Sequence, residues 1–249
     1  MSSGGLRVCS YNIHKGFSQL NRRMMIHELR EQLRKLDPDI SLLQEVQGLH
    51  LHHARFRGDW PEQPQHEYLA GEALHAAYGA NAAYDHGHHG NAVLSRYPIL
   101  RSRNQDVSQY RLEQRGILHC ELAAPGRPVV HGLCVHLSLT ESQRRRQLVM
   151  LADYVAQHVP ADAPLLIGGD FNDWRARAND WLARRLDLVE VFSALGGQPA
   201  RSFPSSLPVL RLDRIYVRGL RPRAAKVLWG RPWSMISDHA PLLVELDYL

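Results

Sequence analysis

Short apolar runs of strand length recur along the whole chain, and turn-forming residues separate them. Runs of this kind predict β-strands at residues 6–11, 39–45, 82–84, 91–95, 117–122, 129–137, 164–169, 212–217, 225–229 and 240–246. Two of them, 117–122 and 129–137, are joined through Pro125-Gly126, which predicts a hairpin. The pattern therefore predicts a protein rich in short strands.

Apolar residues at helical spacing predict helices between some of these strands. Residues 21–36 carry such a stripe, and Asp37-Pro38 ends it. Residues 140–159 carry a second stripe, which opens with the capping-box spacing Thr140-Glu141-Ser142-Gln143 and stops at Pro160. Two further helical segments are expected at 66–78 and around 181–195.

The two halves of the chain repeat one arrangement. Each half has a strand, an amphipathic helix and then an apolar strand that ends in an acid, Glu45 in the first half and Asp170 in the second. Many short strands with few helices, and no break in composition, predict a single α+β domain over residues 1–249, with sheets packed face to face and helices outside. If the halves pack symmetrically, both acids lie at one edge of this sandwich.

Composition narrows the class of protein without deciding its activity. The 249 residues are 44% hydrophobic and 22% charged, which fits one large globular domain and excludes a disordered chain. The net charge of +5 suits a phosphate-bearing partner but is common among soluble proteins. No apolar run approaches the ~20 residues of a membrane span, and no secretion signal precedes the first strand, so we expect a cytoplasmic protein without an obligate protein partner. Cys9, Cys120 and Cys134 are widely spaced in apolar runs and are expected to be buried thiols.

Polar residues at the ends of apolar runs are the candidates for chemistry. A loop edge on a rigid sheet can hold several acids and imidazoles close together. The residues in such positions are Asn12, Glu45, His136, Asp170, Asn172, Asp173, Asp213, Asp238 and His239. Each acid alone is also typical of an ordinary turn or strand cap. Their ligand atoms are oxygen and nitrogen without sulfur, which favours Mg²⁺ or Mn²⁺ over structural zinc.

Seven motifs give the chain a resemblance to the endonuclease/exonuclease/phosphatase superfamily, which includes DNase I, exonuclease III-like abasic-site nucleases, inositol polyphosphate 5-phosphatases and neutral sphingomyelinases. In order, the motifs are Ser10-Tyr11-Asn12-Ile13, Leu43-Gln44-Glu45-Val46, Gly90-Asn91-Ala92-Val93-Leu94-Ser95-Arg96, Val135-His136-Leu137, Gly168-Gly169-Asp170-Phe171-Asn172, Leu212-Asp213-Arg214-Ile215 and Ser237-Asp238-His239-Ala240-Pro241. The resemblance implies a DNase I-like, four-layer α/β/β/α sandwich. It also implies hydrolysis of phosphate esters at one end of the two sheets, with a phosphodiester as the expected substrate.

The resemblance also implies roles for the acids and for the last histidine. Glu45 would hold the divalent cation, and Asn12 and Asp238 would complete or tune its shell. Asp213 would orient His239 as the general base on the attacking water, and Asp170 would steer that water or bind metal.

Further roles concern the phosphate itself. Asn172 and His136 would contact the phosphoryl oxygens, with His136 either stabilising the pentavalent state or protonating the leaving oxygen. Arg115 stands where relatives carry a phosphate-binding arginine. In the DNase I branch a glutamate partners the first histidine, close to the position of Asn91 here. Either Asn91 takes over part of that role at the substrate, or another residue orients His136.

Several readings of the substrate stay open. His136 stands where abasic-site nucleases place a tyrosine, which disfavours that branch, while a lipid headgroup, a small metabolite and a nucleic acid all fit a phosphodiesterase. A DNA endonuclease or exonuclease of the same superfamily is the alternative enzyme. A catalytically silent phosphate-binding module is the alternative from another class. The cluster His86, His88 and His89 is interpreted as a flexible loop beside the site, because no acid or cysteine is spaced to complete a metal site.

Overall fold

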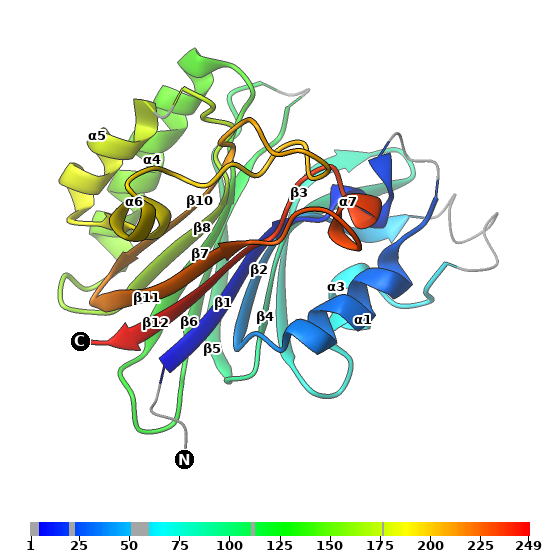
Figure 1. Cartoon of the computed structure of the whole chain (residues 1–249), viewed down its shortest axis with the longest axis horizontal. Helices are drawn as coiled ribbons and strands as arrows, with labels where there is room; N and C mark the ends of the chain where they lie inside the picture. Colours follow the sequence, from blue (N-terminus) through cyan, green and yellow to red (C-terminus); the bar gives the residue numbers. More distant parts are fainter. Residues whose placement is uncertain (1–4, 20–22, 51–59, 111–112, 176) are drawn as a thin grey trace.

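Two β-sheets form the centre of the molecule in a computed structural model that describes residues 5–19, 23–50, 60–110, 113–175 and 177–249 (Figure 1). Within these residues each sheet has six strands. The first sheet has the order β11-β12-β1-β2-β4-β3, with bounds Leu220–Val227, Leu242–Tyr248, Gly5–Asn12, Ile40–His50, Gly87–Ser95 and His75–Tyr84. The second sheet has the order β5-β6-β7-β8-β10-β9, with bounds Ile99–Asp106, Gly116–Leu122, Val130–His136, Leu165–Asp170, Asp213–Arg218 and Val189–Glu190.

Helices cover the outer faces of both sheets. In Figure 1, α1 (Ile26–Leu36), α3 (Gln65–Ala70) and α7 (Trp233–Ile236) lie on the side of the first sheet, whereas α4 (Glu141–His158) and α5 (Arg177–Leu186) lie on the side of the second. A short 3₁₀ turn, η1 (His14–Gly16), follows β1, and α6 (Val191–Gly196) follows β9. The fold is therefore the expected four-layer α/β/β/α sandwich.

Three apolar clusters explain why the layers hold together. Successive side chains of a strand point to opposite faces, so Val8 of β1 packs between the two sheets while Cys9 packs under the helices of the first sheet. The third cluster joins the second sheet to α4 and α5, with Leu151 and Val155 of α4 buried on it. Because the strands are buried on both faces, their sequences read as continuous apolar runs.

Parallel crossovers place the ends of four strands at one edge of the sandwich. β1 pairs with β2 in parallel across α1, and β7 pairs with β8 in parallel across α4. Parallel neighbours end at the same edge of a sheet, since a crossover returns the chain to the starting edge. The prediction that Glu45 and Asp170 reach one edge is thereby confirmed, because the side chain of Asn12 contacts both.

Some predicted elements were wrong in detail. The helix predicted at 66–78 ends at Ala70, and His75–Tyr84 forms β3 instead. The helix predicted from Asn21 begins at Ile26; residues 20–22 lie outside the described residues. His88 and His89 belong to β4 and not to a loop, and β5 was not predicted at all. The segment around 181–195 is split between α5 and α6 by the two-residue strand β9.

Other predictions are confirmed. β6 and β7 form the predicted antiparallel hairpin. Thr140 occupies the N-cap position of α4, although its side chain makes no capping hydrogen bond. All three cysteines are buried free thiols. Among the described residues, no helix combines the length and apolar character needed to cross a membrane.

Candidate active site

Three polar residues stand in one row across the second sheet. Asp170, the last residue of β8, is in register with His136 on β7 and with Asp213 on β10. All three side chains are almost fully buried, with residue exposures of 1–6%. The sheet therefore fixes two acids and an imidazole side by side at the edge where its strands end.

The first sheet brings a second set of polar residues to the same edge. Asn12 ends β1, and Glu45 lies on β2 at a register shift where its backbone is left-handed, with φ 56°. Asp238 and His239 lie between α7 and β12. The Ser237 hydroxyl donates a hydrogen bond to the Asn12 carbonyl oxygen at 2.8 Å, which ties this segment to the end of β1.

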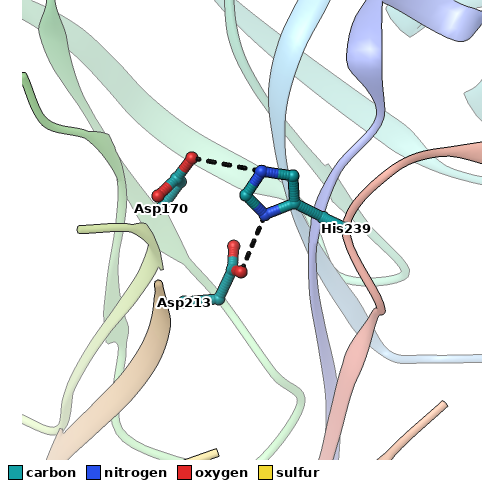
Figure 2. Close-up of side chains that lie close together, drawn as sticks. All are labelled: Asp170, Asp213 and His239. Atoms are coloured by element: carbon teal, nitrogen blue, oxygen red, sulfur yellow. Dashed lines mark hydrogen bonds and ion pairs between the residues drawn. The ribbon is translucent and has the colours of Figure 1, made fainter. Parts of the chain in front are cut away.

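His239 reaches from the first sheet to two acids of the second, as Figure 2 shows. Its Nδ1 lies 2.8 Å from Asp213 Oδ2, and its Nε2 lies 3.7 Å from Asp170 Oδ2. Burial alone would lower the pKa of His239, but the charges of Asp213 and Asp170 outweigh it and raise that pKa. The result is an imidazole with high proton affinity, held in one orientation by Asp213.

The environment of Asp213 reinforces this orientation. Ser202 donates its hydroxyl hydrogen to Asp213 Oδ2, the oxygen that also faces His239. The ring of Phe203 packs against the ring of His239, with centroids 5.1 Å apart. Ser202 and Phe203 thus restrict the rotation of the Asp213–His239 pair.

Asp170 and His136 are both almost fully buried. Asp170 accepts hydrogen bonds from the backbone N–H of Asn172 at 2.9 Å and from Asn12 Nδ2 at 3.2 Å, and His136 Nε2 lies 3.5 Å away. Burial raises the pKa of Asp170. Burial, with Arg115 nearby, holds the pKa of His136 well below its usual range, so this imidazole is neutral at neutral pH.

Asn12 links the two sheets through its amide. Its Nδ2 faces both Glu45 Oε1, at 3.3 Å, and Asp170, while its Oδ1 accepts a hydrogen bond from the backbone N–H of His14. An amide nitrogen is a donor and does not ligate cations. In this arrangement Asn12 orients the two acids toward each other.

Glu45 and Asp238 are the acids at the open rim. Their side chains keep 22% and 27% of their surface exposed. Lys15 Nζ lies 3.8 Å from Glu45 Oε2, and His14 Nδ1 lies 2.9 Å from Asp238 Oδ1. Burial works to raise the pKa of Asp238, but the hydrogen bond to His14 and the positive charges of His239 and His14 together outweigh it and lower that pKa.

The predicted phosphate-binding residues lie around His136. Asn172, with φ 50°, donates from Nδ2 to the Leu137 carbonyl oxygen at 2.9 Å. Arg115 is held by the same carbonyl, at 3.3 Å from Nε, and by Glu113, at 3.0 Å from Nη2. Asp173, also singled out in the sequence, is buried, and its carbonyl accepts a hydrogen bond from Arg214.

Asn91 lies deeper than a substrate-binding residue would. Its Nδ2 donates to the carbonyl oxygens of Gly116 and Cys134, and its buried Oδ1 has no hydrogen-bond partner. The Asn91 side chain therefore makes no hydrogen bond to His136. It connects β4 of the first sheet to the β6–β7 hairpin beneath the site.

The donor set fits a hard divalent cation. Asp170, Asp213 and His239 each offer one ligand atom within 4.8 Å of the others. Both ring nitrogens of His239 face acids, and the partly open carboxylates of Glu45 and Asp238 could also hold a cation at this edge. Carboxylate oxygens reached by water are what Mg²⁺ and Mn²⁺ require, because these ions keep part of their hydration shell.

Several residues of the site were not found from the sequence. His14 and Lys15 contact Asp238 and Glu45, and their one signal was their place directly after the Asn12 motif. His89 on β4, interpreted as part of a loop, is close enough to Lys15, Glu45 and Arg115 for their charges to act on its pKa, which burial lowers. Ser202 gave no sequence signal.

Comparisons with known proteins agree with this geometry. A family model described as "Endonuclease/Exonuclease/phosphatase family" matches residues 9–239. The Escherichia coli (strain K12) protein YbhP is 47% identical over 243 residues, which cover 96% of this chain and 95% of the relative.

Solved structures share the fold at lower identity. An endonuclease/exonuclease/phosphatase from Beutenbergia cavernae superposes with a TM-score of 0.77 at 19% identity, over 98% of this chain and 72% of its own. A mannosyl-6-phosphatase from Bacteroides thetaiotaomicron has a TM-score of 0.72 at 16% identity, over 98% of this chain and 100% of its own.

Proposed function

The chain belongs to the endonuclease/exonuclease/phosphatase family, a family of phosphoester hydrolases, and on that premise we propose that it is a divalent-metal-dependent phosphodiesterase. One observation carries the proposal. His239 lies between Asp213 and Asp170 at the edge where both sheets end, beside the partly exposed acids Glu45 and Asp238.

His239 is the general base of the proposed reaction. Asp213 holds its Nδ1 at 2.8 Å, which leaves Nε2 directed at the buried end of the site, next to Asp170. A water between Nε2 and the phosphorus loses its proton to His239 as its oxygen forms the new bond to phosphorus, while the bond from phosphorus to the leaving ester oxygen breaks and that oxygen takes up a proton from water. Asp170 accepts a hydrogen bond from this water and directs its lone pair at the phosphorus.

Glu45 and Asp238 would hold the cation, Mg²⁺ or Mn²⁺, and Asn12 would orient Glu45. When bound, the cation supplies positive charge beside the phosphoryl oxygens and lowers the proton affinity of nearby groups. This second effect matters for His239, since its raised pKa would otherwise keep it protonated and unable to act as a base.

Hydrogen-bond donors fixed by the fold bind the phosphoryl group in this proposal. His136, whose lowered pKa keeps it neutral, donates from its ring. Asn172 and Arg115 lie on either side of the Leu137 carbonyl and extend the donor set. Donors fixed before the substrate arrives stabilise the charge that develops in the transition state.

A chromogenic phosphodiester tests the proposal. We expect hydrolysis of bis(p-nitrophenyl) phosphate with Mg²⁺ or Mn²⁺, its loss in EDTA, and a fall in kcat of about 10²–10⁴-fold in Asp213→Asn. Asp162→Asn, at an exposed loop position, is the matched control and should keep wild-type kcat. Turnover that survives EDTA would contradict the metal dependence, and phosphate binding without turnover under any divalent ion would establish a silent binding module.

Parallel assays distinguish the substrate classes. The panel is plasmid DNA, an abasic oligonucleotide, sphingomyelin, a glycerophospholipid, a phosphoinositide and a small phosphomonoester. A phosphodiesterase cleaves at least one diester faster than the monoester. Preference for the monoester would assign the chain to the phosphatases of the family.

A further inference from the structure

The turn after β1 has three consecutive residues in the left-handed backbone conformation. His14, Lys15 and Gly16 have φ values of 48°, 57° and 75°. A left-handed conformation costs roughly 1–2 kcal/mol for each residue with a side chain. Two consecutive non-glycine residues therefore hold a conformation that the surrounding structure must enforce.

Contacts from distant segments enforce this conformation. The backbone N–H of Ile13 donates to the Gln44 carbonyl oxygen at 3.0 Å, and Gln65 Nε2 donates to the Lys15 carbonyl oxygen at 2.8 Å. A Cβ on Gly16 would lie 2.6 Å from Gln65 Nε2, so only glycine fits there. The backbone of the turn is thus fixed while its side chains project over the site.

The two side chains of the turn meet the two rim acids. His14 Nδ1 lies 2.9 Å from Asp238 Oδ1, and Lys15 Nζ lies 3.8 Å from Glu45 Oε2. Consecutive residues thus place a basic group on each of the carboxylates assigned to the cation. The Lys15 contact is the looser of the two, because 3.8 Å exceeds hydrogen-bond length and 36% of this side chain is exposed.

Lys15 also faces the phosphate-binding side of the site. Its charge contributes to the lowered pKa of both His136 and His89, after the larger effect of burial. The ammonium group, which contacts Glu45, is therefore also near enough to these two imidazoles for its charge to act on them. A lysine is a compact charge on a flexible four-carbon stem and can exchange partners over a few ångströms.

We propose that Lys15 is a substrate-binding residue that serves two acidic partners in turn, Glu45 in the metal-free chain and the substrate phosphate in the loaded enzyme. The exchange follows from charge, since a divalent cation on Glu45 repels the ammonium group and an adjacent phosphate attracts it. The negative charge of Glu45 is thus neutralised in both states, by the Lys15 ammonium group without the cation and by the cation when it is bound. This inference rests on the proposed function.

Lys15→Met tests the exchange because it keeps the stem and removes the charge. Titration calorimetry with Mn²⁺, without substrate, should show binding about three- to tenfold tighter than wild type, because a competing cation is gone. With Mn²⁺ saturating, the Kd of inorganic phosphate and the KM for the chromogenic diester should rise about tenfold. Lys15→Arg should restore both values toward wild type.

The two readouts move in opposite directions, which a structural defect would not produce. Lys35→Met, at an exposed position of α1, is the matched control and should leave both values unchanged. A Lys15→Met protein that binds both Mn²⁺ and phosphate more weakly would assign Lys15 a structural role, and one with both values unchanged would remove it from the site. A wild-type protein that binds no divalent ion would instead defeat the proposed function.

Discussion

The β1–α1–β2 and β7–α4–β8 halves have the same plan but end in acids of opposite character. In both, a helix connects two parallel strands and an acid stands at the active edge. Glu45 of the first half remains partly exposed beside Lys15. Asp170 of the second half is 2% exposed and lies among His136, Asn172 and His239.

Local backbone geometry explains the difference. Glu45 occupies a register shift between Leu43 and Val46, where a positive φ turns its side chain out of the strand row. Asp170 ends its strand without a shift, in line with His136 and Asp213. One repeated pattern thus supplies a partly exposed acid, Glu45, and a buried acid, Asp170.

The largest effect in this comparison is expected from removing His239, the proposed base, which lies against the buried acid Asp170. His239→Ala should lower kcat by about 10³–10⁴-fold, since general-base assistance and the orientation of the water are both lost. Raising the Mn²⁺ concentration should not restore the activity, because the cation acids remain. Steady-state kinetics across a metal titration measure this, with His75→Ala, exposed on β3, as the control. Recovery at high Mn²⁺ would show that His239 serves the cation.

Removing the open acid should give the complementary result. Glu45→Gln is expected to lower activity by about 10²-fold at low Mn²⁺, and added Mn²⁺ should restore a large part of it, because the variant weakens the cation site and leaves the base intact. Calorimetry should show a weaker Mn²⁺ affinity that matches the kinetic shift. Equal Mn²⁺ affinity in Glu45→Gln and wild type would place the cation on other residues.

The fold was largely predictable because the strands carry their signal locally. Buried strands read as apolar runs, and the acids that end them stand next to those runs in the sequence. The failure at 66–78 has a tertiary cause. Gly71 ends the helix. Residues 75–84 form a strand because they pair with β4, for example Ala76 with Leu94, and this pairing cannot be predicted from the local sequence pattern.

The sequence predicted most of the residues of the site, but it did not predict all the contacts among them. The family motifs named Asp213 and His239, and their pairing is present at 2.8 Å. The basic partners of the rim acids depend on a left-handed turn that is fixed by residues far along the chain, Gln44 and Gln65. Such contacts between distant segments have no periodicity, so His14 and Lys15 were missed.

The two halves also differ in the residues that precede their acids, which predicts a difference in stability. Gly168-Gly169 precedes Asp170, whereas Leu43-Gln44 precedes Glu45. A Cβ on Gly169 would lie 1.9 Å from the Val135 carbonyl oxygen, at a φ of 151°. Gly169→Ala should lower the free energy of unfolding by roughly 2–4 kcal/mol in urea titrations. Gly196→Ala, where a Cβ meets nothing within 4 Å, is the control, and an equal effect in both would contradict the close approach.

The outer layers extend the comparison, since a histidine–tyrosine cluster lies between helix and sheet on each side of the sandwich. On the side of the second sheet, His119 hydrogen-bonds through Nδ1 to the Tyr154 hydroxyl and through Nε2 to His131. On the side of the first sheet, the His66 ring stacks on Tyr78, with centroids 4.7 Å apart. Burial lowers the pKa of His119 to about 4 and also lowers that of His66, where the charge of Glu67 works in the opposite direction.

These two pKa shifts predict the smallest of the four effects, a loss of stability in mild acid to which His119 contributes more than His66. An unfolded histidine titrates near pH 6.5. Between about pH 6.5 and 4, residue 119 is therefore protonated in the unfolded chain but neutral in the folded one. The free energy of unfolding consequently falls as pH falls. At pH 5.5 the cost is about 1 kcal/mol relative to pH 7.5. His119→Gln should flatten this part of the urea-derived stability profile, and His66→Gln should change it less. A profile flattened more by His66→Gln than by His119→Gln would place the acid-sensitive contact on the side of the first sheet.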